Sequence, residues 1–144
     1  DVVPPGVLRR DAERAWTMFQ DPTHAGVVVV TLPEDMPTSE TLELIDVLER
    51  ELMLPVASLV VNAVIEEMFS DADRKSLLAE RELDRHRPGD EAIACGIRRS
   101  IRERVQIESL IRLAGVRAPR VELPLIRTDA DTLEAVRSLA ERFV

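Results

Sequence analysis

The sequence GVVVVTL at residues 26–32 decides the fold. A continuous run of β-branched residues, without alternation of apolar and polar side chains, is typical of a parallel-sheet strand that is covered on both faces. The sequence ASLVVN at residues 57–62 repeats the pattern. Between the two runs, Pro37–Glu40 offers a hydroxyl cap for a helix whose apolar face is Leu44, Ile45, Leu48 and Leu52. The segment therefore predicts a right-handed, parallel strand–helix–strand unit.

Helices are predicted on both sides of this unit. Leu8–Phe19 has apolar residues at helical spacing and is stopped by Asp21-Pro22. Residues 68–114 form a long, charged helical excursion, with one helix from Asp71 or Asp73 to about Arg85. A second helix runs from about Glu91 to Leu113, with its apolar stripe stepping by four and Gly115 as a left-handed cap. The stripe consists of Ile93, Ile97, Ile101 and Val105.

A third strand and a last helix complete the predicted order. Val121–Leu123 is a short strand that ends at Pro124. Thr128 or Asp129 caps an amphipathic helix that contains Leu133, Val136 and Phe143. Residues 1–144 are therefore expected to form a single α/β domain, one parallel-sheet layer with a helical excursion.

Composition excludes several classes of function. The 144 residues carry a formal net charge of −8, which argues against a nucleic-acid partner because such a partner requires a positive surface. No apolar run approaches the roughly 20 residues that span a bilayer, so we expect no direct membrane insertion. Cys95 is the only cysteine, which fits a reducing, cytoplasmic location. The N-terminus lacks an initiator Met and does not resemble a signal peptide, so we expect a processed chain or a fragment.

A phosphate-binding loop is absent from the sequence. Such a loop needs clustered glycines followed by Lys and Ser or Thr, whereas the five glycines stand alone. We therefore expect no ATP or GTP hydrolysis by this chain alone. The two histidines are far apart and only one cysteine is present, so a zinc site is not expected either. An arginine cluster is interpreted as a solvated helix face paired with Glu103 and Glu108, an anion or partner site being the alternative. The cluster contains Arg98, Arg99, Arg102 and Arg104.

The carboxyl ends of the predicted strands are the best candidates for a ligand site. In open parallel sheets, ligands bind outside these ends. The first end is Thr31-Leu32-Pro33-Glu34, with Glu40-Thr41 beyond it; the second is Asn62 and the third Leu123-Pro124-Leu125. An Asn amide can donate to and accept from the edge of a purine. The simpler readings are a turn residue for Asn62, a strand terminator for Pro33 and a solvated acid for Glu34.

Four short motifs occur in an order that resembles a known family. They are VVVTLPE at residues 28–34, Glu40-Thr41 at the head of a helix, LVVN at residues 59–62 and ELPL at residues 122–125. In this order and spacing they resemble the C-terminal part of the nucleotide-binding domain of the arsenite-pump and tail-anchored-protein-targeting ATPases. That family is a deviant P-loop group of anion-transporting ATPases.

The resemblance implies a homodimeric ATPase that binds ATP with Mg²⁺ between its subunits and serves a membrane-protein client or a pump. Asn62 matches the residue that recognises adenine, Pro124 and Leu125 match the segment lining the base pocket, and Glu34 matches a position near the nucleoside. The family's glycine-rich loop and switch residues are missing, and so are its metal-binding thiols. The chain is thus expected to supply the adenine pocket and a partner surface of an ATPase, with Mg²⁺ bound only by an intact protein.

Two other functions stay open on the sequence. One is a non-enzymatic interaction module, in which the helical excursion binds a protein and the nucleotide pocket is vestigial. The other is a response-regulator-like domain, which needs an acidic cluster at the strand ends, where only Glu34 is available.

Overall fold

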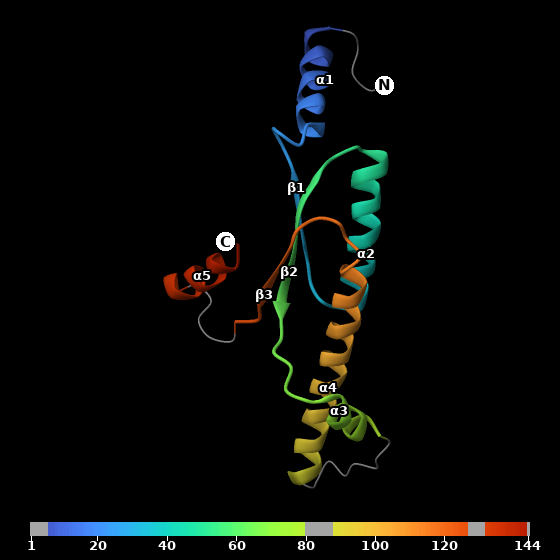
Figure 1. Cartoon of the computed structure of the whole chain (residues 1–144), viewed down its shortest axis with the longest axis vertical. Helices are drawn as coiled ribbons and strands as arrows, with labels where there is room; N and C mark the ends of the chain where they lie inside the picture. The colour runs from blue at the N-terminus through green and yellow to red at the C-terminus, as the bar shows by residue number, and fades with distance from the viewer. Residues whose placement is uncertain (1–5, 80–87, 127–131, 144) are drawn as a thin grey trace.

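Three parallel strands form the centre of the protein. The computed structural model describes residues 6–79, 88–126 and 132–143. Within them, β1 (Val27–Thr31), β2 (Val56–Val64) and β3 (Arg120–Pro124) are ordered β1-β2-β3, with both neighbouring pairs parallel (Figure 1). The predicted α/β class with a parallel sheet is therefore confirmed, including the crossover from β1 to β2.

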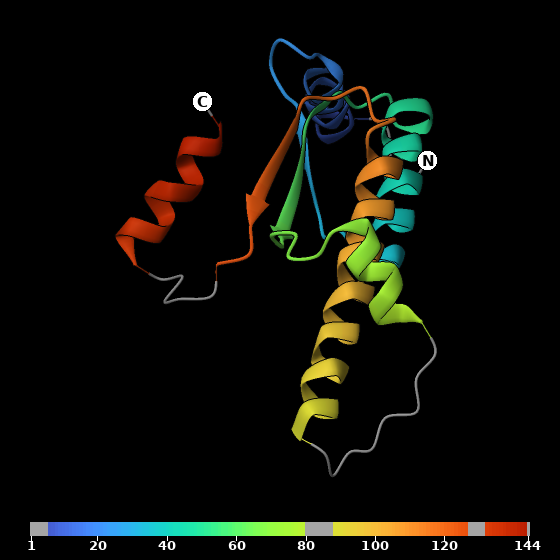
Figure 2. The same cartoon turned by 60° about the horizontal axis from the view of Figure 1, so that its bottom comes forward.

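The described residues also form five α-helices. They are α1 (Val7–Gln20), α2 (Asp35–Asp46), α3 (Asp71–Leu78), α4 (Pro88–Leu113) and α5 (Leu133–Ala140). A π-helical turn, η1 (Val47–Glu51), follows α2, and a 3₁₀ turn, η2 (Glu141–Phe143), follows α5. Helices α2 and α4 pack against each other beside the sheet, and α3 packs on α4 (Figures 1 and 2).

The hydrophobic core lies between the sheet and this pair of helices. Val29 of β1 and Leu59 of β2 are almost fully buried. So are Ile45 of α2, Leu48 of η1 and Leu113 at the end of α4. Alternate residues of a strand point to opposite faces, which places Val29, Leu59 and Val61 on the helix-covered face. Burial of this apolar set is the main source of the stability of the fold.

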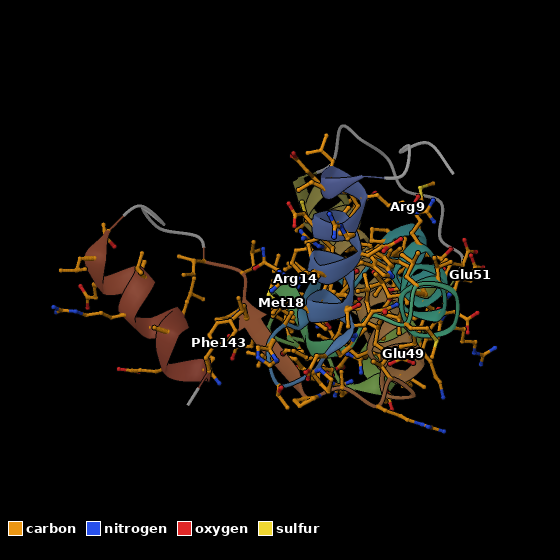
Figure 3. All side chains as sticks on the ribbon, turned by 90° about the horizontal axis from the view of Figure 1, so that it is seen from above. Arg9, Arg14, Met18, Glu49, Glu51 and Phe143 are labelled. Carbon is orange, nitrogen blue, oxygen red and sulfur yellow. The ribbon has the colours of Figure 1, made fainter. Side chains whose placement is uncertain are left out.

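The opposite face of β1 is open, contrary to the expectation of a strand covered on both faces. Val28 and Val30 leave 55% and 64% of their surface exposed, because α2 and α4 pack on the other face. Helices α1 and α5 contain no buried residue and stand away from the sheet; Figure 3 shows Met18 on α1 and Phe143 beyond α5.

A β-bulge interrupts β2 near its carboxyl end. Val61 pairs with Glu122 and Val64 pairs with Pro124, so Asn62 and Ala63 together face one residue of β3. Ala63 takes a left-handed conformation with φ of 59°. The strand therefore continues two residues beyond Asn62, which was predicted to end it.

Helix α2 begins earlier than predicted, and no hydroxyl caps it. Glu34 is at the N-cap position, and no side chain there accepts a capping bond. Ser39 instead donates to the carbonyl oxygen of Asp35. The predicted apolar face is right for Ile45 and Leu48, whereas Leu44 is 48% exposed beside the edge of the sheet.

Helices α3 and α4 also differ in detail from the prediction. Ser70, and not an Asp, caps α3 through a reciprocal capping box with Asp73. The helix ends at Leu78, short of Arg85, which lies outside the described residues. Gly115 does not adopt the predicted left-handed cap, since no described glycine has a positive φ. Ile101 is 42% exposed, because a step of four residues drifts around a helix of 3.6 residues per turn.

The cap of the last helix is a threonine outside the predicted pair. Thr132 is the N-cap of α5, and its hydroxyl accepts a hydrogen bond from the amide of Ala135. The predicted capping residues, Thr128 and Asp129, lie outside the described residues.

Candidate functional site

The carboxyl edge of the sheet brings the three predicted strand ends to the same side. Thr31 pairs with Val61, immediately before Asn62. Pro124 pairs with Val64, and the amide of Leu125 donates to the carbonyl oxygen of Val64 at 2.8 Å. The parallel topology thus places Asn62, Pro124 and Leu125 along one edge.

A pocket of about 320 Å³ opens between β1 and α2 at this edge. This volume is at the lower end of the range of about 300–1,000 Å³ for small-molecule sites. Its polar lining is Thr31, Glu40, Thr41 and Asn62; its apolar walls include Leu32 and Leu44. The Thr41 hydroxyl donates to Oγ1 of Thr31 at 2.8 Å, and the Thr31 hydroxyl lies 3.3 Å from the carbonyl oxygen of Pro37. These buried hydroxyls satisfy one another and fix β1 to the start of α2.

The amide of Asn62 is held by the bulge and remains available to a ligand. Its Oδ1 accepts a hydrogen bond from the Ala63 amide at 2.9 Å, which orients the side-chain plane. The residue is exposed, and its Nδ2 group has no hydrogen-bond partner among the described residues. A carbonyl-type oxygen has two lone pairs, so Oδ1 can accept a second bond while Nδ2 donates.

The other predicted site residues lie around this pocket but do not line it. Pro124 borders a pocket of about 350 Å³ with Glu122 and Arg142. Leu125 borders one of about 640 Å³ with Arg99 and Met68. Glu34, exposed at the N-cap of α2, lines none of these three pockets. The structure therefore joins Asn62 with the Thr31–Glu40–Thr41 group and leaves the other three residues on neighbouring surfaces.

Two buried side chains of α4 hold the segment that follows β2. The side-chain amide of Gln106 pairs with Ile65 as a strand would: Oε1 accepts from the Ile65 amide at 2.7 Å, and Nε2 donates to its carbonyl oxygen at 2.8 Å. The fully buried carboxylate of Glu103 accepts hydrogen bonds from the backbone amides of Met68 and Phe69, at 2.9 and 3.3 Å. Helix α4 thus fixes residues 65–69, which border the pockets of Pro124 and Leu125.

Two arginines neutralise the buried carboxylate. Arg99 reaches Glu103 at 2.8 Å and Arg74 reaches it at 3.1 Å; Arg74 also pairs with Asp71 at 2.7 Å. Burial raises the pKa of Glu103, but the hydrogen bonds from the Met68 amide, Arg99 and Arg74 outweigh it and leave the pKa below its ordinary value. Glu103 is therefore ionised at neutral pH.

The buried network was not predicted from the sequence. Arg99 and Glu103 were expected on a solvated helix face, and this prediction is wrong because Glu103 is buried. The same prediction is right for Arg104 and Glu108, which form an exposed pair 3.9 Å apart. The available signal was the spacing of Glu103 and Gln106 with Leu110 and Leu113, which continues the buried stripe of α4 at steps of three and four.

The described part of the chain contains no metal site, and its cysteine and histidine have only local contacts. No group of three or more His, Cys, Asp and Glu residues there could hold a metal ion. Cys95 is exposed on α4, 2.9 Å from a guanidinium nitrogen of Arg98. His24 bonds Asp21 at 3.0 Å, whereas His86 lies outside the described residues. None of the described helices combines the length and apolar character that a membrane span requires.

The chain matches no protein-family model and no curated protein sequence. The function is therefore inferred from the ordered motifs and from the geometry at the carboxyl edge of the sheet.

Proposed function

We propose that the pocket beside Asn62 is the adenine-recognising part of an ATP site. In this proposal the chain is the C-terminal portion of an ATPase of the arsenite-pump and tail-anchored-protein-targeting type, without hydrolysis of its own. The observation that carries the proposal is the Asn62 amide, which is oriented by a bulge at the carboxyl edge of a parallel sheet. Its Nδ2 group has no hydrogen-bond partner in the part of the chain that the structure describes.

The chemistry of the pocket suits an adenine base. Nδ2 of Asn62 can donate to a ring nitrogen while Oδ1 accepts from the exocyclic amino group. Leu32 and Leu44 offer apolar surface for the faces of the base, both being partly exposed at the pocket. Pro124 and Leu125 as a further wall, and Glu34 near the nucleoside, belong to the proposal through the resemblance alone.

The phosphates and Mg²⁺ do not fit the residues present. Clustered backbone amides from a glycine-rich loop are required to wrap phosphates, and the sequence has none. The described residues also offer no metal-ligand cluster. Phosphoryl transfer depends on positioning phosphate, metal and water together, so these residues perform base recognition and no chemical step.

The resemblance extends the proposal to partners and location. It places the protein in the cytoplasm as a homo-oligomer that serves a membrane-protein client or a pump. A non-enzymatic interaction module is the second candidate function, favoured by the exposed apolar side chains of α1 and α5. Trp16 and Phe19 of α1 are 42% and 48% exposed, and Leu133 of α5 is 65% exposed. Contiguous patches of exposed apolar side chains are a feature of protein-binding surfaces.

Substitution of Asn62 tests the proposed function. We expect the 144-residue chain to bind ATP and adenosine with a dissociation constant in about the millimolar range, because only the base is recognised. Asn62→Asp keeps the Oδ1 bond to Ala63 but loses the Nδ2 donor, and it should weaken adenosine binding by about tenfold or more. Saturation-transfer NMR titration with adenosine, ATP and inorganic phosphate measures these affinities.

The matched control is Ser58→Ala, a small polar change earlier on the same strand. It should leave adenosine affinity unchanged, and inorganic phosphate should not compete. Absence of adenosine binding by the wild-type chain, or equal affinity in Asn62→Asp, would contradict the proposal and favour a vestigial pocket. Robust ATP turnover by the purified chain would contradict it as well.

A further inference from the structure

The pocket between β1 and α2 contains a carboxylate for which the described residues offer no partner. Glu40 lines this pocket of about 320 Å³ together with Asn62. Its side chain makes no hydrogen bond or ion pair with any described residue. Ser39, the preceding residue of α2, contacts α4 instead: its Oγ accepts a hydrogen bond from Arg112 at 2.7 Å. The carboxylate of Glu40 is therefore not used to hold α2 against α4, and it is available to a ligand of the pocket.

The polar side chains of this pocket offer more hydrogen-bond acceptors than donors. The hydroxyl proton of Thr41 is donated to Oγ1 of Thr31 at 2.8 Å, and that of Thr31 is directed to the carbonyl oxygen of Pro37 at 3.3 Å. A carboxylate such as that of Glu40 only accepts. Among the described side chains that line the pocket, Nδ2 of Asn62 is therefore the one free donor. Such a lining selects a ligand that brings several donors of its own.

The side chains of Glu40 and Asn62 approach the pocket from different walls. Asn62 follows Val61, which pairs with Thr31 across one strand spacing of about 4.8 Å. Glu40 precedes Thr41, whose hydroxyl reaches Thr31 from the helix at 2.8 Å. Thr31 therefore lies between the two walls, and a ligand that contacts both has to span strand and helix. A pocket of this volume suits a ligand of nucleoside size better than a base alone.

A ribonucleoside has polar groups that match both walls. In the proposed adenine site, the amide of Asn62 takes the edge of the base, because it can both donate and accept. The ribose then presents its 2′- and 3′-hydroxyl groups side by side as two donors, and a carboxylate presents two acceptor oxygens. Acidic side chains bind ribose hydroxyls in this way in doubly wound α/β folds.

We propose that Glu40 holds the ribose of the bound nucleoside and accepts hydrogen bonds from its 2′- and 3′-hydroxyl groups. The pocket then selects ribonucleosides over deoxyribonucleosides. This inference rests on the proposed function, since it takes a nucleoside as the ligand. It adds a residue that the resemblance does not supply. Glu34, the acid that the resemblance places near the nucleoside, does not line this pocket.

NMR titration of the 144-residue chain with adenosine, 2′-deoxyadenosine and 3′-deoxyadenosine tests the role of Glu40. These ligands are uncharged, so a change in the net charge of the protein does not by itself alter their affinity. We expect the wild-type chain to bind adenosine about fivefold to tenfold more tightly than either analogue, because each analogue lacks one charge-assisted hydrogen bond. Glu40→Ala removes the acceptor and should bring all three nucleosides to a similar affinity.

Glu43→Ala is the matched control, because Glu43 is exposed on the same helix and does not line the pocket. It should preserve the preference for adenosine, and the comparison of the three ligands on the wild-type chain needs no variant. Equal affinity of the wild-type chain for the three nucleosides would overturn the inference. So would a preference that survives Glu40→Ala or is lost in Glu43→Ala. If adenosine binding then still depends on Asn62, the proposed function stands and only the role of Glu40 fails, whereas absence of adenosine binding overturns both.

Discussion

Ala63 is one of two non-glycine residues with a positive φ in the described part of the chain, the other being Met53. Its φ of 59° places a Cβ-bearing residue in the left-handed region next to Asn62. That conformation costs about 1–2 kcal/mol for an ordinary L-residue. The strained conformation belongs to the β-bulge that displaces Asn62 from regular strand pairing, and the backbone amide of Ala63 donates a hydrogen bond to Oδ1 of Asn62.

Replacing Ala63 with glycine should stabilise the protein. Glycine removes the left-handed penalty but gains about 0.4–1 kcal/mol of unfolded-state entropy, so the expected net gain in unfolding free energy is about 0.5 kcal/mol. Urea denaturation measures it. Ala57→Gly on the same strand is the control and should destabilise by about 0.5–1 kcal/mol, because Ala57 has no positive φ. Loss of stability in Ala63→Gly would show that the bulge is not strained.

The sequence predicted Asn62 as a site residue but could not predict its setting. Alanine carries no preference for the left-handed region, so nothing in the residue types announced the bulge. Strand-end position and amide chemistry were enough to select Asn62, whereas its orientation depends on the pairing of β2 with β3.

Helix α4 is the element on which the carboxyl edge depends, and Glu103 is its most sensitive position. Glu103→Gln leaves Arg74 and Arg99 without their shared carboxylate, and removing one partner of a buried ion pair costs about 3 kcal/mol. Chemical denaturation at neutral pH measures the loss. Glu108→Gln, at the exposed pair with Arg104, is the control and should change stability by less than about 0.5 kcal/mol.

The contribution of Glu103 should also depend on pH. Its pKa is lowered in the folded protein, so its stabilising effect is fully present above the unfolded-state pKa and is lost as pH falls through the folded-state value. The stability difference between wild type and Glu103→Gln should therefore narrow in acid. Asp71 and Asp73, whose pKa values are also lowered, titrate in both proteins, so the difference isolates Glu103. A gap that is constant down to pH 3 would contradict this assignment.

Element type and order were predictable, whereas helix ends and buried polar positions were not. Periodicity located α2 and α4, because apolar residues recur on the faces that pack on the sheet. It missed Gln106 and Glu103, since polar side chains on a buried face acquire a role only through the backbone of residues 65–69. The end of α4 was not predictable either: Gly115 is at the position of a left-handed cap, but its φ is not positive.

At the scale of the whole molecule, the parallel topology followed from the two valine-rich runs and the crossover length. The open face did not follow, because a β-branched run records apolar surroundings without identifying what covers them. Val29 and Thr31 are buried under helices, while Val28 and Val30 remain exposed. The prediction that β1 is covered on both faces was therefore right for the face under α2 and wrong for the opposite face.

The pairing of Gln106 with Ile65 gives the protein a natural reporter of its own helix docking. The amide proton of Ile65 is held by a side chain of α4 and not by a neighbouring strand. Hydrogen–deuterium exchange at this amide therefore requires α4 to lift from the sheet, even while the strands remain paired. A single protected proton thus separates detachment of the helical layer from opening of the sheet.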